Sequence, residues 1–292
     1  MIQCGDRGTV LVREAGGANG KNNRHGRKVV SMEVIIRATQ EEAVSLTAAL
    51  IAQALVQKPN LVLGLATGRT MESVYELLAG MHRDNDLDFS LARTFNLDEY
   101  VGLPPEDPNS YRFYMNKHLF HRVNIDLRNT HLPNGMAEDI AAECRHYEEE
   151  ITDCNGIDLQ LLGIGRTGHI GFNEPMSALH SRTRPKALAP GTVAQNEPLF
   201  TEGTAMPRRA ITMGVGTILE SRRCILLATG KEKAEIIAKA VEGPVTAMIS
   251  ASALQFHPNC TVIVDQGAGS LLQNTDYYRW VFENEPEWEP YQ

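Results

Sequence analysis

Short apolar runs alternate with stretches of helical periodicity along most of the chain. Each run holds five or six residues, the usual length of a buried strand, and the runs cover 32–37, 61–66, 91–95, 157–162, 224–228 and 260–264. Between them, apolar residues recur every three or four positions, which predicts helices over about 39–54, 70–78, 109–120, 137–151 and 231–241. Thr39 and Glu42 have the spacing of a capping box, so we expect the first helix to begin there.

The predicted strands are continuously apolar instead of alternating, which is typical of a parallel sheet covered by helices on both faces. No internal repeat or linker divides residues 32–292. We therefore predict one α/β domain over 32–292, a three-layer Rossmann-like domain with a mostly parallel central sheet. Ligands of such sheets bind beyond the carboxyl ends of the strands.

The first 31 residues differ from the rest in composition. They carry six basic side chains against two acidic ones, contain six glycines and lack the apolar segment of a secretory signal. They also offer no periodic apolar face. We therefore predict that residues 1–31 are a flexible basic leader and that the folded domain begins near Met32.

Composition and charge exclude several classes of protein. The 292 residues carry 28 basic and 36 acidic side chains, a net charge of −8, which argues against a nucleic-acid surface. No apolar run approaches the ~18 residues that a bilayer crossing needs, so we expect no membrane role. The five cysteines are scattered without a C-x-x-C pair, which favours reduced thiols and a cytoplasmic location.

Polar, glycine-bearing clusters follow three of the predicted strands and suggest one composite site. Thr67, Gly68, Arg69 and Thr70 join a strand to a helix, where free amides and hydroxyls would suit a phosphate. An ordinary strand–helix turn capped by Thr70 explains the same residues equally well. The segment is not a Walker A loop, which would need G-x-x-x-x-G-K-[ST].

The glycine-rich segment 163–168 matches G-x-G-x-x-G, but no helix pattern follows it, so we reject a dinucleotide site. Its glycines more simply present His169, a candidate acid or base, and Glu174, which would orient it. A structural histidine is the plainer alternative. Asp98 follows another strand beside Glu99, and only one of these neighbours is expected to face the site. The histidines at 118, 121 and 131 lack a completing carboxylate or thiolate, so we predict no metal.

Several motifs in register resemble the glucosamine-6-phosphate deaminase family. The signature stretches are Phe-Asn-Leu-Asp-Glu-Tyr-Val-Gly-Leu at 95–103 and Gly-His-Ile-Gly-Phe-Asn-Glu-Pro at 168–175, and the segment 63–68 resembles the family's phosphate loop. The segments 181–184, 211–217 and 241–243 also fit. The likeness runs in order from about Met32 to about Asp265, so it covers most of the chain.

The resemblance implies a cofactor-free isomerisation and deamination of glucosamine 6-phosphate to fructose 6-phosphate and ammonia, in amino-sugar metabolism and N-acetylglucosamine catabolism. Asp98 would move a proton from C2 to C1. His169, supported by Glu174 and Thr167, would open the sugar ring. The phosphate would be held by five residues: Thr67, Gly68, Arg69, Thr70 and Lys233.

Two positions depart from the family pattern. Thr167 stands where the family usually has Asp or Asn, so the charge of that relay member is lost. Pro198 stands where the family commonly has a phosphate-binding arginine. Arg69 or the arginines at 208 and 209 would then have to compensate.

The resemblance also implies a homo-oligomer and, more weakly, an allosteric sugar-phosphate site at Ser177, Arg184 and Lys186. The irregular stretch 184–207 falls where the family has a mobile lid. Three alternatives remain open: deamination of another amino-sugar phosphate, a 6-phosphogluconolactonase, and a non-catalytic sugar-phosphate sensor. The Phe-Asn-Glu-Pro ending disfavours the lactonase. A sensor of this fold normally carries a DNA-binding domain, for which the 31-residue leader is too short.

Overall fold

The computed structural model describes residues 2–4, 10–12, 32–200 and 204–292. Its central sheet has seven strands that pair in parallel throughout. Their spatial order is β3 (Glu33–Arg37), β12 (Cys260–Asp265), β11 (Cys224–Ala228), β8 (Leu159–Leu162), β4 (Val62–Leu65), β5 (Arg93–Asn96) and β7 (Thr130–His131). The predicted parallel sheet is confirmed. Its central strands are buried along their whole length because both faces are covered, and they are mostly apolar, with Gln160 in β8 a buried polar exception.

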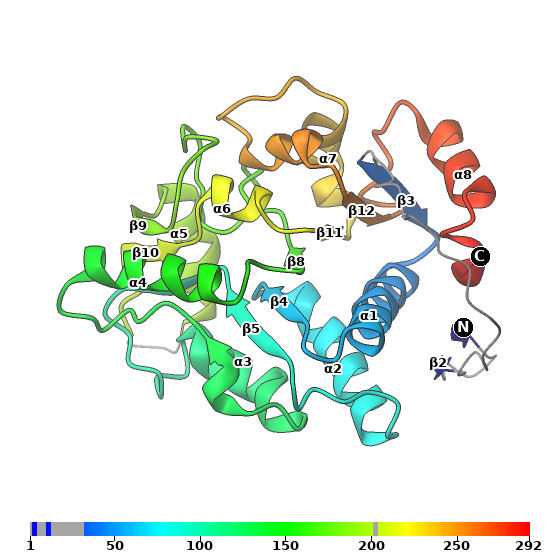
Figure 1. The fold of residues 1–292 in the computed structure, drawn as a ribbon. Coiled ribbons are helices and arrows are strands. Elements are labelled where there is room, and N and C mark those ends of the chain that lie inside the picture. Colours follow the sequence, from blue (N-terminus) through cyan, green and yellow to red (C-terminus); the bar gives the residue numbers. More distant parts are fainter. Residues whose placement is uncertain (1, 5–9, 13–31, 201–203) are drawn as a thin grey trace.

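Helices cover the two faces of this sheet (Figure 1), which makes the three predicted layers. They are α1 (Gln40–Gln57), α2 (Arg69–Arg83), α3 (Tyr111–His118), α4 (Ile140–Asp153), α5 (Pro190–Asn196), α6 (Val215–Leu219), α7 (Ala234–Val241) and α8 (Thr275–Asn284). As predicted, α1 begins after Thr39, whose hydroxyl accepts a hydrogen bond of 3.2 Å from the amide of Glu42. In Figure 1, α1 and α2 lie together on one side of the sheet and α7 on the other.

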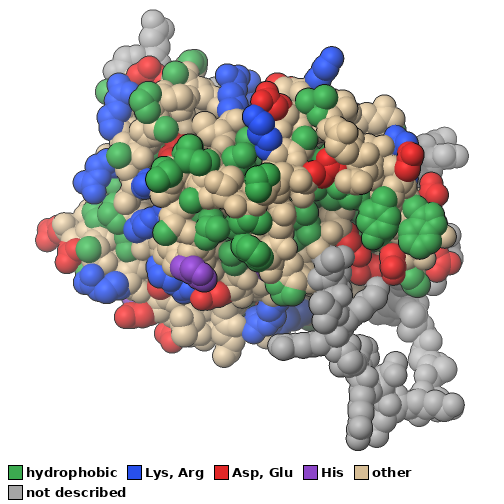
Figure 2. Space-filling model, turned by 90° about the horizontal axis from the view of Figure 1, so that it is seen from above, with side chains coloured by type: hydrophobic (Ala, Val, Ile, Leu, Met, Phe, Trp, Pro, Cys, Tyr) green, Lys and Arg blue, Asp and Glu red, His purple; other side chains and the backbone are tan. Residues whose placement is uncertain are grey.

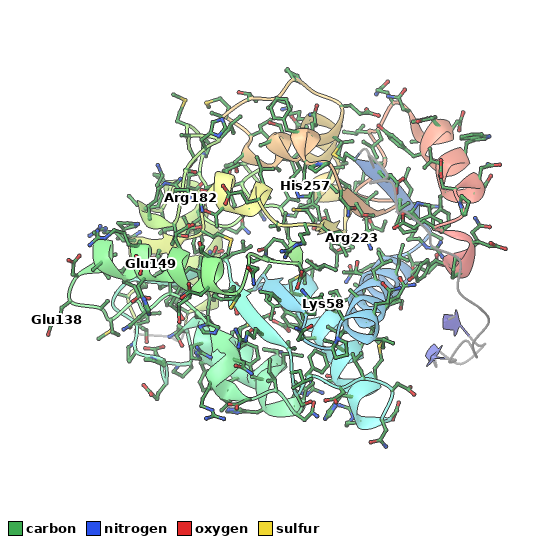
Figure 3. All side chains as sticks on the ribbon, viewed as in Figure 1. Lys58, Glu138, Glu149, Arg182, Arg223 and His257 are labelled. Carbon is green, nitrogen blue, oxygen red and sulfur yellow. The ribbon has the colours of Figure 1, made fainter. Side chains whose placement is uncertain are left out.

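An ion-pair cluster lies at the amino ends of the central strands. Asp158, just before β8, accepts hydrogen bonds from Lys58 at 2.6 Å and from Arg222 at 2.9 Å. The amide of Val62 donates to the same carboxylate at 2.9 Å. Figure 3 shows Lys58 beside α1, near the middle of the molecule. The carboxyl ends of the strands therefore remain available for a ligand.

A second, antiparallel sheet of three short strands was not predicted. Its order is β6 (Asp98–Tyr100), β10 (Arg209–Thr212) and β9 (Arg184–Ala187), with Thr212 opposite both Asp98 and Arg184. These strands hold three or four residues, several of them polar, and β9 contains a proline. They carry no periodic apolar signal, so only their pairing in the fold makes them strands.

Of the predicted flexible leader, only two short strands fall within the described residues. These are β1 (Ile2–Cys4) and β2 (Val10–Val12), which pair antiparallel. The other leader residues lie outside the described part of the chain, so the leader's flexibility stays a prediction. Within the described residues, no helix combines the length and apolar character needed to cross a bilayer.

The outer face in Figure 2 mixes basic and acidic side chains with scattered apolar ones. At the right of this view, where α8 lies, large apolar rings reach the surface. The exposed aromatic side chains of α8 are Tyr277 and Trp280, which are 62% and 57% accessible.

Candidate active site

Four neighbouring strands of the central sheet deliver the predicted site residues to one edge. The strands β11, β8, β4 and β5 are adjacent in the sheet order. Beyond their carboxyl ends lie, respectively, Lys233, the segment 163–174, the segment 67–70 and Asp98. The fold therefore gathers residues that are up to 166 positions apart in the sequence. The three polar clusters that the sequence suggested share one edge of the sheet.

The segment 67–70 ends β4 and begins α2. Gly68 is the residue before the helix and has φ +125°, a backbone conformation that other residues rarely adopt. The Tyr114 hydroxyl donates to its carbonyl at 2.8 Å. Gly68 and Arg69 are exposed, and Thr67 and Thr70 are partly exposed. The helix begins at Arg69, two residues earlier than capping by Thr70 would require, so the threonine hydroxyl is not the cap.

Asp98 and Glu99 point to different partners, as expected for neighbours on a strand. Glu99 accepts three backbone hydrogen bonds, from the amides of Tyr100, Tyr111 and Arg112 at 2.8, 3.0 and 2.9 Å. It therefore anchors the start of α3. Asp98 faces the loop after β8, where the amide of Phe172 donates a hydrogen bond of 3.0 Å to the Thr212 hydroxyl and acts to lower the pKa of Asp98. One of its carboxyl oxygens lies 3.4 Å from the position of a Cβ on Gly171.

The electrostatic environment of this pair favours the protonated forms. Burial and the charge of Glu99 raise the pKa of Asp98 to about 8. Burial raises the pKa of Glu99 to about 7, against the opposing effect of its three amide donors. Asp98 has fewer donors, so it is the carboxyl group that keeps its proton more readily. A carboxyl group with a pKa near neutrality can both take up and release a proton under physiological conditions.

His169 is held at Nδ1 by two oxygen atoms. The Thr167 hydroxyl lies 2.9 Å and a Glu174 carboxylate oxygen 3.2 Å from this nitrogen. Burial acts to raise the pKa of Glu174, but the hydrogen bonds from His169 and Thr192 outweigh it and hold the pKa below the ordinary value. An ionised carboxylate only accepts hydrogen bonds, so Nδ1 carries the proton. In the neutral ring, Nε2 then holds the free electron pair.

Gly165 lets the histidine ring approach the backbone. A Cβ at this position would lie 2.0 Å from His169 Nε2, so a larger residue would displace the ring. The amide of Gly165 also donates to the carbonyl of His169 at 2.9 Å. Of the three glycines in the G-x-G-x-x-G match, Gly165 is thus the one that makes room for the His169 ring.

Lys233 reaches the same loop from the end of β11. Its ammonium donates to the carbonyl of Ile164 at 2.7 Å. Burial and the neighbouring charge of Arg166 lower the pKa of Lys233. The first turn of α2 lies close by, since the Met71 methyl is 3.3 Å from the position of a Cβ on Gly163. Lys233 and the segment 67–70 thus flank one loop.

Of the residues predicted for an allosteric site, Arg184 and Lys186 lie on β9, and Ser177 precedes this strand in the sequence. Arg184 donates to the side-chain oxygen of Asn173 at 2.9 Å, and its Nη2 is buried without a partner among the described residues. Ser177 is also buried, and its hydroxyl has no partner in the part of the chain that the structure describes. Lys186 is partly exposed. Their allosteric role stays a prediction.

Sequence reasoning missed two groups of residues around the site. Thr192 on α5 donates to Glu174 at 2.5 Å. The Tyr111 hydroxyl donates to that of Tyr100 at 3.2 Å, and Asn196 on α5 donates to Tyr100 at 3.2 Å as well. The stretch 184–207 was expected to be irregular, yet it contains β9 and α5. The sequence predicted neither element, because proline and glycine are uncommon in strands and helices, and here they occupy a strand and the first turn of a short helix.

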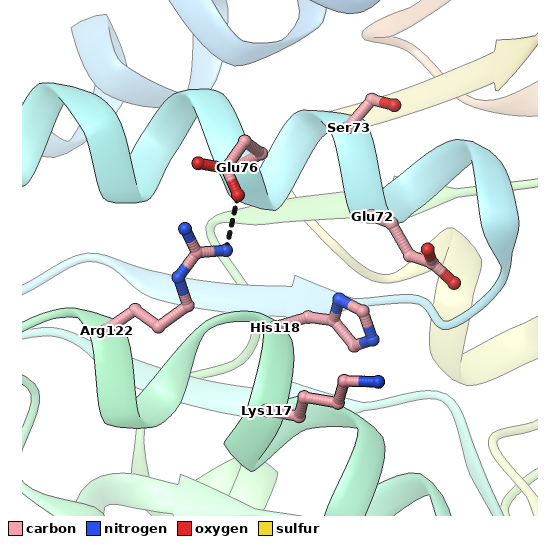
Figure 4. A pocket seen from close by; sticks show the side chains of 6 residues that line it. All are labelled: Glu72, Ser73, Glu76, Lys117, His118 and Arg122. Carbon is pink, nitrogen blue, oxygen red and sulfur yellow. Dashed lines mark ion pairs between the residues drawn. The ribbon is translucent and has the colours of Figure 1, made fainter.

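A surface pocket between α2 and the end of α3 has none of the predicted site residues in its lining. It is lined by Glu72, Ser73, Glu76, Lys117, His118 and Arg122. Figure 4 shows Arg122 reaching across to Glu76, an ion pair of 2.6 Å. Tyr114 packs against His118 with ring centres 4.5 Å apart and ring planes tilted by 35°, and its hydroxyl donates to the carbonyl of Gly68, so α3 contacts the segment 67–70.

The fold and the site define a class: a Rossmann-like α/β protein whose polar groups gather beyond the carboxyl ends of parallel strands. Comparison with known families identifies which one. Residues 36–263 match the model of glucosamine-6-phosphate isomerases/6-phosphogluconolactonase. The chain belongs to this family.

Individual relatives show which members of this family are similar to the chain. A glucosamine-6-phosphate deaminase from Hahella chejuensis is 49% identical over 250 residues, 86% of this chain and 95% of the relative. One from Geobacillus sp. is 50% identical over 241 residues, 82% and 96% of the two chains. A solved structure described as a monomeric glucosamine-6-phosphate deaminase has 44% identity and a TM-score of 0.80, covering 82% of this chain and 100% of its own. A 6-phosphogluconolactonase from Trypanosoma brucei, 20% identical with a TM-score of 0.64 and coverages of 84% and 100%, shares the fold alone.

Proposed function

We propose that this protein converts glucosamine 6-phosphate and water to fructose 6-phosphate and ammonia. The observation that carries the proposal is that relatives with 49–50% identity over nearly their whole length are named glucosamine-6-phosphate deaminase. The site supports it, because a buried carboxyl group and a histidine–carboxylate pair share the edge of the sheet with a lysine. The lactonase alternative loses support, since the lactonase compared above is only 20% identical.

In the proposed mechanism, His169 first opens the sugar ring. With Nδ1 protonated toward Glu174, the free electron pair of Nε2 can take the proton from the O1 hydroxyl and return it to the ring oxygen. Thr167 keeps a hydrogen bond to Nδ1, although it brings no charge. The position where the chain departs from the family pattern therefore still supplies a hydrogen-bond partner to Nδ1.

Asp98 then acts on carbon. As a carboxylate it removes the C2 proton of the open-chain amino aldehyde, while the ammonium group of the substrate gives a proton to O1; the result is an enolamine. Asp98 then returns its proton to C1. The product is a protonated imine at C2, which water hydrolyses to the ketone with release of ammonium. The raised pKa of Asp98 makes its carboxylate a stronger base than an ordinary aspartate.

The phosphate would bind between the segment 67–70 and Lys233, which flank the loop after β8. The amides at the start of α2, the hydroxyls of Thr67 and Thr70 and the side chain of Arg69 are suitable donors. Among the described residues, no carboxylate forms an ion pair with the ammonium group of Lys233. Because Pro198 replaces the family's arginine, we give Lys233 the main share of phosphate binding.

Ammonia release from glucosamine 6-phosphate and galactosamine 6-phosphate, measured side by side, tests the reaction and the choice of epimer. In deuterated water, the wild type should place deuterium at C1 of fructose 6-phosphate. Asp98→Asn, which keeps the shape but removes the base, should reduce turnover by ~10² to 10⁴. Tight binding of an amino-sugar phosphate without any ammonia release would support the sensor alternative instead.

We further propose a cytoplasmic location and a role in N-acetylglucosamine catabolism, both in keeping with this activity. The homo-oligomer implied by the family resemblance stays a prediction. The solved relative with 44% identity is described as monomeric. Light scattering on the purified protein measures its mass directly and decides between the two states.

A further inference from the structure

Glu174 is bound on both sides, and only one side involves the histidine. One carboxylate oxygen faces His169 Nδ1 at 3.2 Å. The other accepts hydrogen bonds from the Thr192 hydroxyl at 2.5 Å and from the amide of Ala189 at 3.3 Å. These last two donors come from α5 and the residue before it. A segment outside the two signature stretches therefore fixes the carboxylate that orients the histidine.

The Thr192 contact is suited to hold a charge in place. Thr192 is 3% exposed and Glu174 4%, so water does not compete for the bond. A hydroxyl can donate only one proton, and here it is directed at a carboxylate. Such charge-assisted bonds are short and stronger than bonds between neutral groups. Removing the hydroxyl would leave Glu174 Oε1 with the longer contact to Ala189 alone.

We infer that Thr192 is a positioning residue for the proposed deamination: through Glu174 it fixes the orientation of His169 with the proton on Nδ1 and the free electron pair on Nε2. The expected effect on kcat rests on the proposed function, whereas the expected orientation of His169 does not. It has particular weight in this chain because Thr167, the second partner of Nδ1, carries no charge. The orientation of the ring and the position of its proton on Nδ1 then depend on Glu174.

The test compares Thr192→Val, which keeps the shape, with Thr192→Ser, which keeps the hydroxyl. We expect Thr192→Val to lower kcat by about 10-fold or more with KM changed less than about 2-fold, since phosphate binding lies elsewhere. Thr192→Ser should restore most of kcat. The ¹⁵N chemical shifts of His169 should show a protonated Nδ1 in the wild type and a mixture of tautomers in Thr192→Val.

Two controls separate this role from a general loss of packing. Thr217→Val removes a similar buried hydroxyl bond, of 2.7 Å to Glu148, which is a partner of neither His169 nor Glu174. Asn196→Ala removes another polar anchor of α5, its bond to Tyr100, without touching Glu174. Both variants should keep the Nδ1-protonated signature of His169.

Wild-type kcat together with an unchanged ¹⁵N signature in Thr192→Val would overturn the inference. A tautomer mixture in Asn196→Ala equal to that in Thr192→Val would also overturn it, because loosening of α5 would then be the cause. Absence of ammonia release from the wild type would refute the proposed function, while the NMR comparison would still decide the role of Thr192.

Discussion

Replacement of Asp98 by asparagine should stabilise the protein, and by more as the pH rises. The carboxyl group is 6% exposed, and burial with the charge of Glu99 raises its pKa from the ordinary 3.8 to about 8. Between these two values the folded protein keeps a proton that the unfolded chain has lost. The folded state of the wild type is therefore progressively disfavoured over this range, and the asparagine variant avoids the effect.

The magnitude follows from the size of the pKa difference. One unit corresponds to about 1.4 kcal/mol, so the free-energy cost of the Asp98 carboxylate is near zero at pH 4 and has a ceiling of roughly 6 kcal/mol above pH 8. Relaxation around the charge reduces this ceiling. We expect Asp98→Asn to be more stable than the wild type by about 1 kcal/mol or less near pH 4.5 and by ~2 kcal/mol or more at pH 8.5.

Urea denaturation at pH 4.5, 6.5 and 8.5 measures the free energy of unfolding of both proteins. Asp88→Asn is the matched control with the opposite sign. The amide of Ser90 donates to this exposed carboxylate, and the pKa of Asp88 is lowered, so its replacement should cost stability that appears as the pH rises. A stability difference between Asp98→Asn and the wild type that does not change with pH would refute the reasoning about burial.

Three further predictions concern the lysine, the glycine loop and the leader. Lys233→Ala should raise KM by about 10-fold or more through loss of a charge-assisted contact of ~1.5–3 kcal/mol, while the exposed Lys231→Ala should not; equal KM values would assign the phosphate to other groups. Gly165→Ala places a Cβ 2.0 Å from His169 Nε2 and should lower kcat by ~10²-fold, whereas Gly191→Ala, with open space around it, should keep wild-type kcat. Normal turnover of Gly165→Ala would show that the ring can move without loss. Deletion of residues 1–31 should preserve solubility and ammonia release, because the segment has no periodic apolar face; an insoluble or inactive product would contradict that.

The sequence determined the central architecture because burial leaves a periodic mark on the chain. Continuously apolar runs predicted the buried parallel strands, and the helical spacing after Thr39 located α1 with its cap. The positions of Asp98, His169 and Lys233 after three such runs also placed them at one edge of the sheet. Residues at the carboxyl ends of adjacent parallel strands must lie near each other, whatever their separation in sequence.

Only the tertiary structure decided the small antiparallel sheet and the contacts of α5. The strand β6 holds three residues, which is too short for any period to appear, and Thr212 reaches Asp98 through pairing across 114 positions. Thr192 looks like any other hydroxyl residue in a stretch rich in glycine and proline. Its bond to Glu174 depends on how α5 packs against the loop after β8. Hydrophobic periodicity records burial, whereas the partner of a single polar group is fixed by the three-dimensional path of the chain.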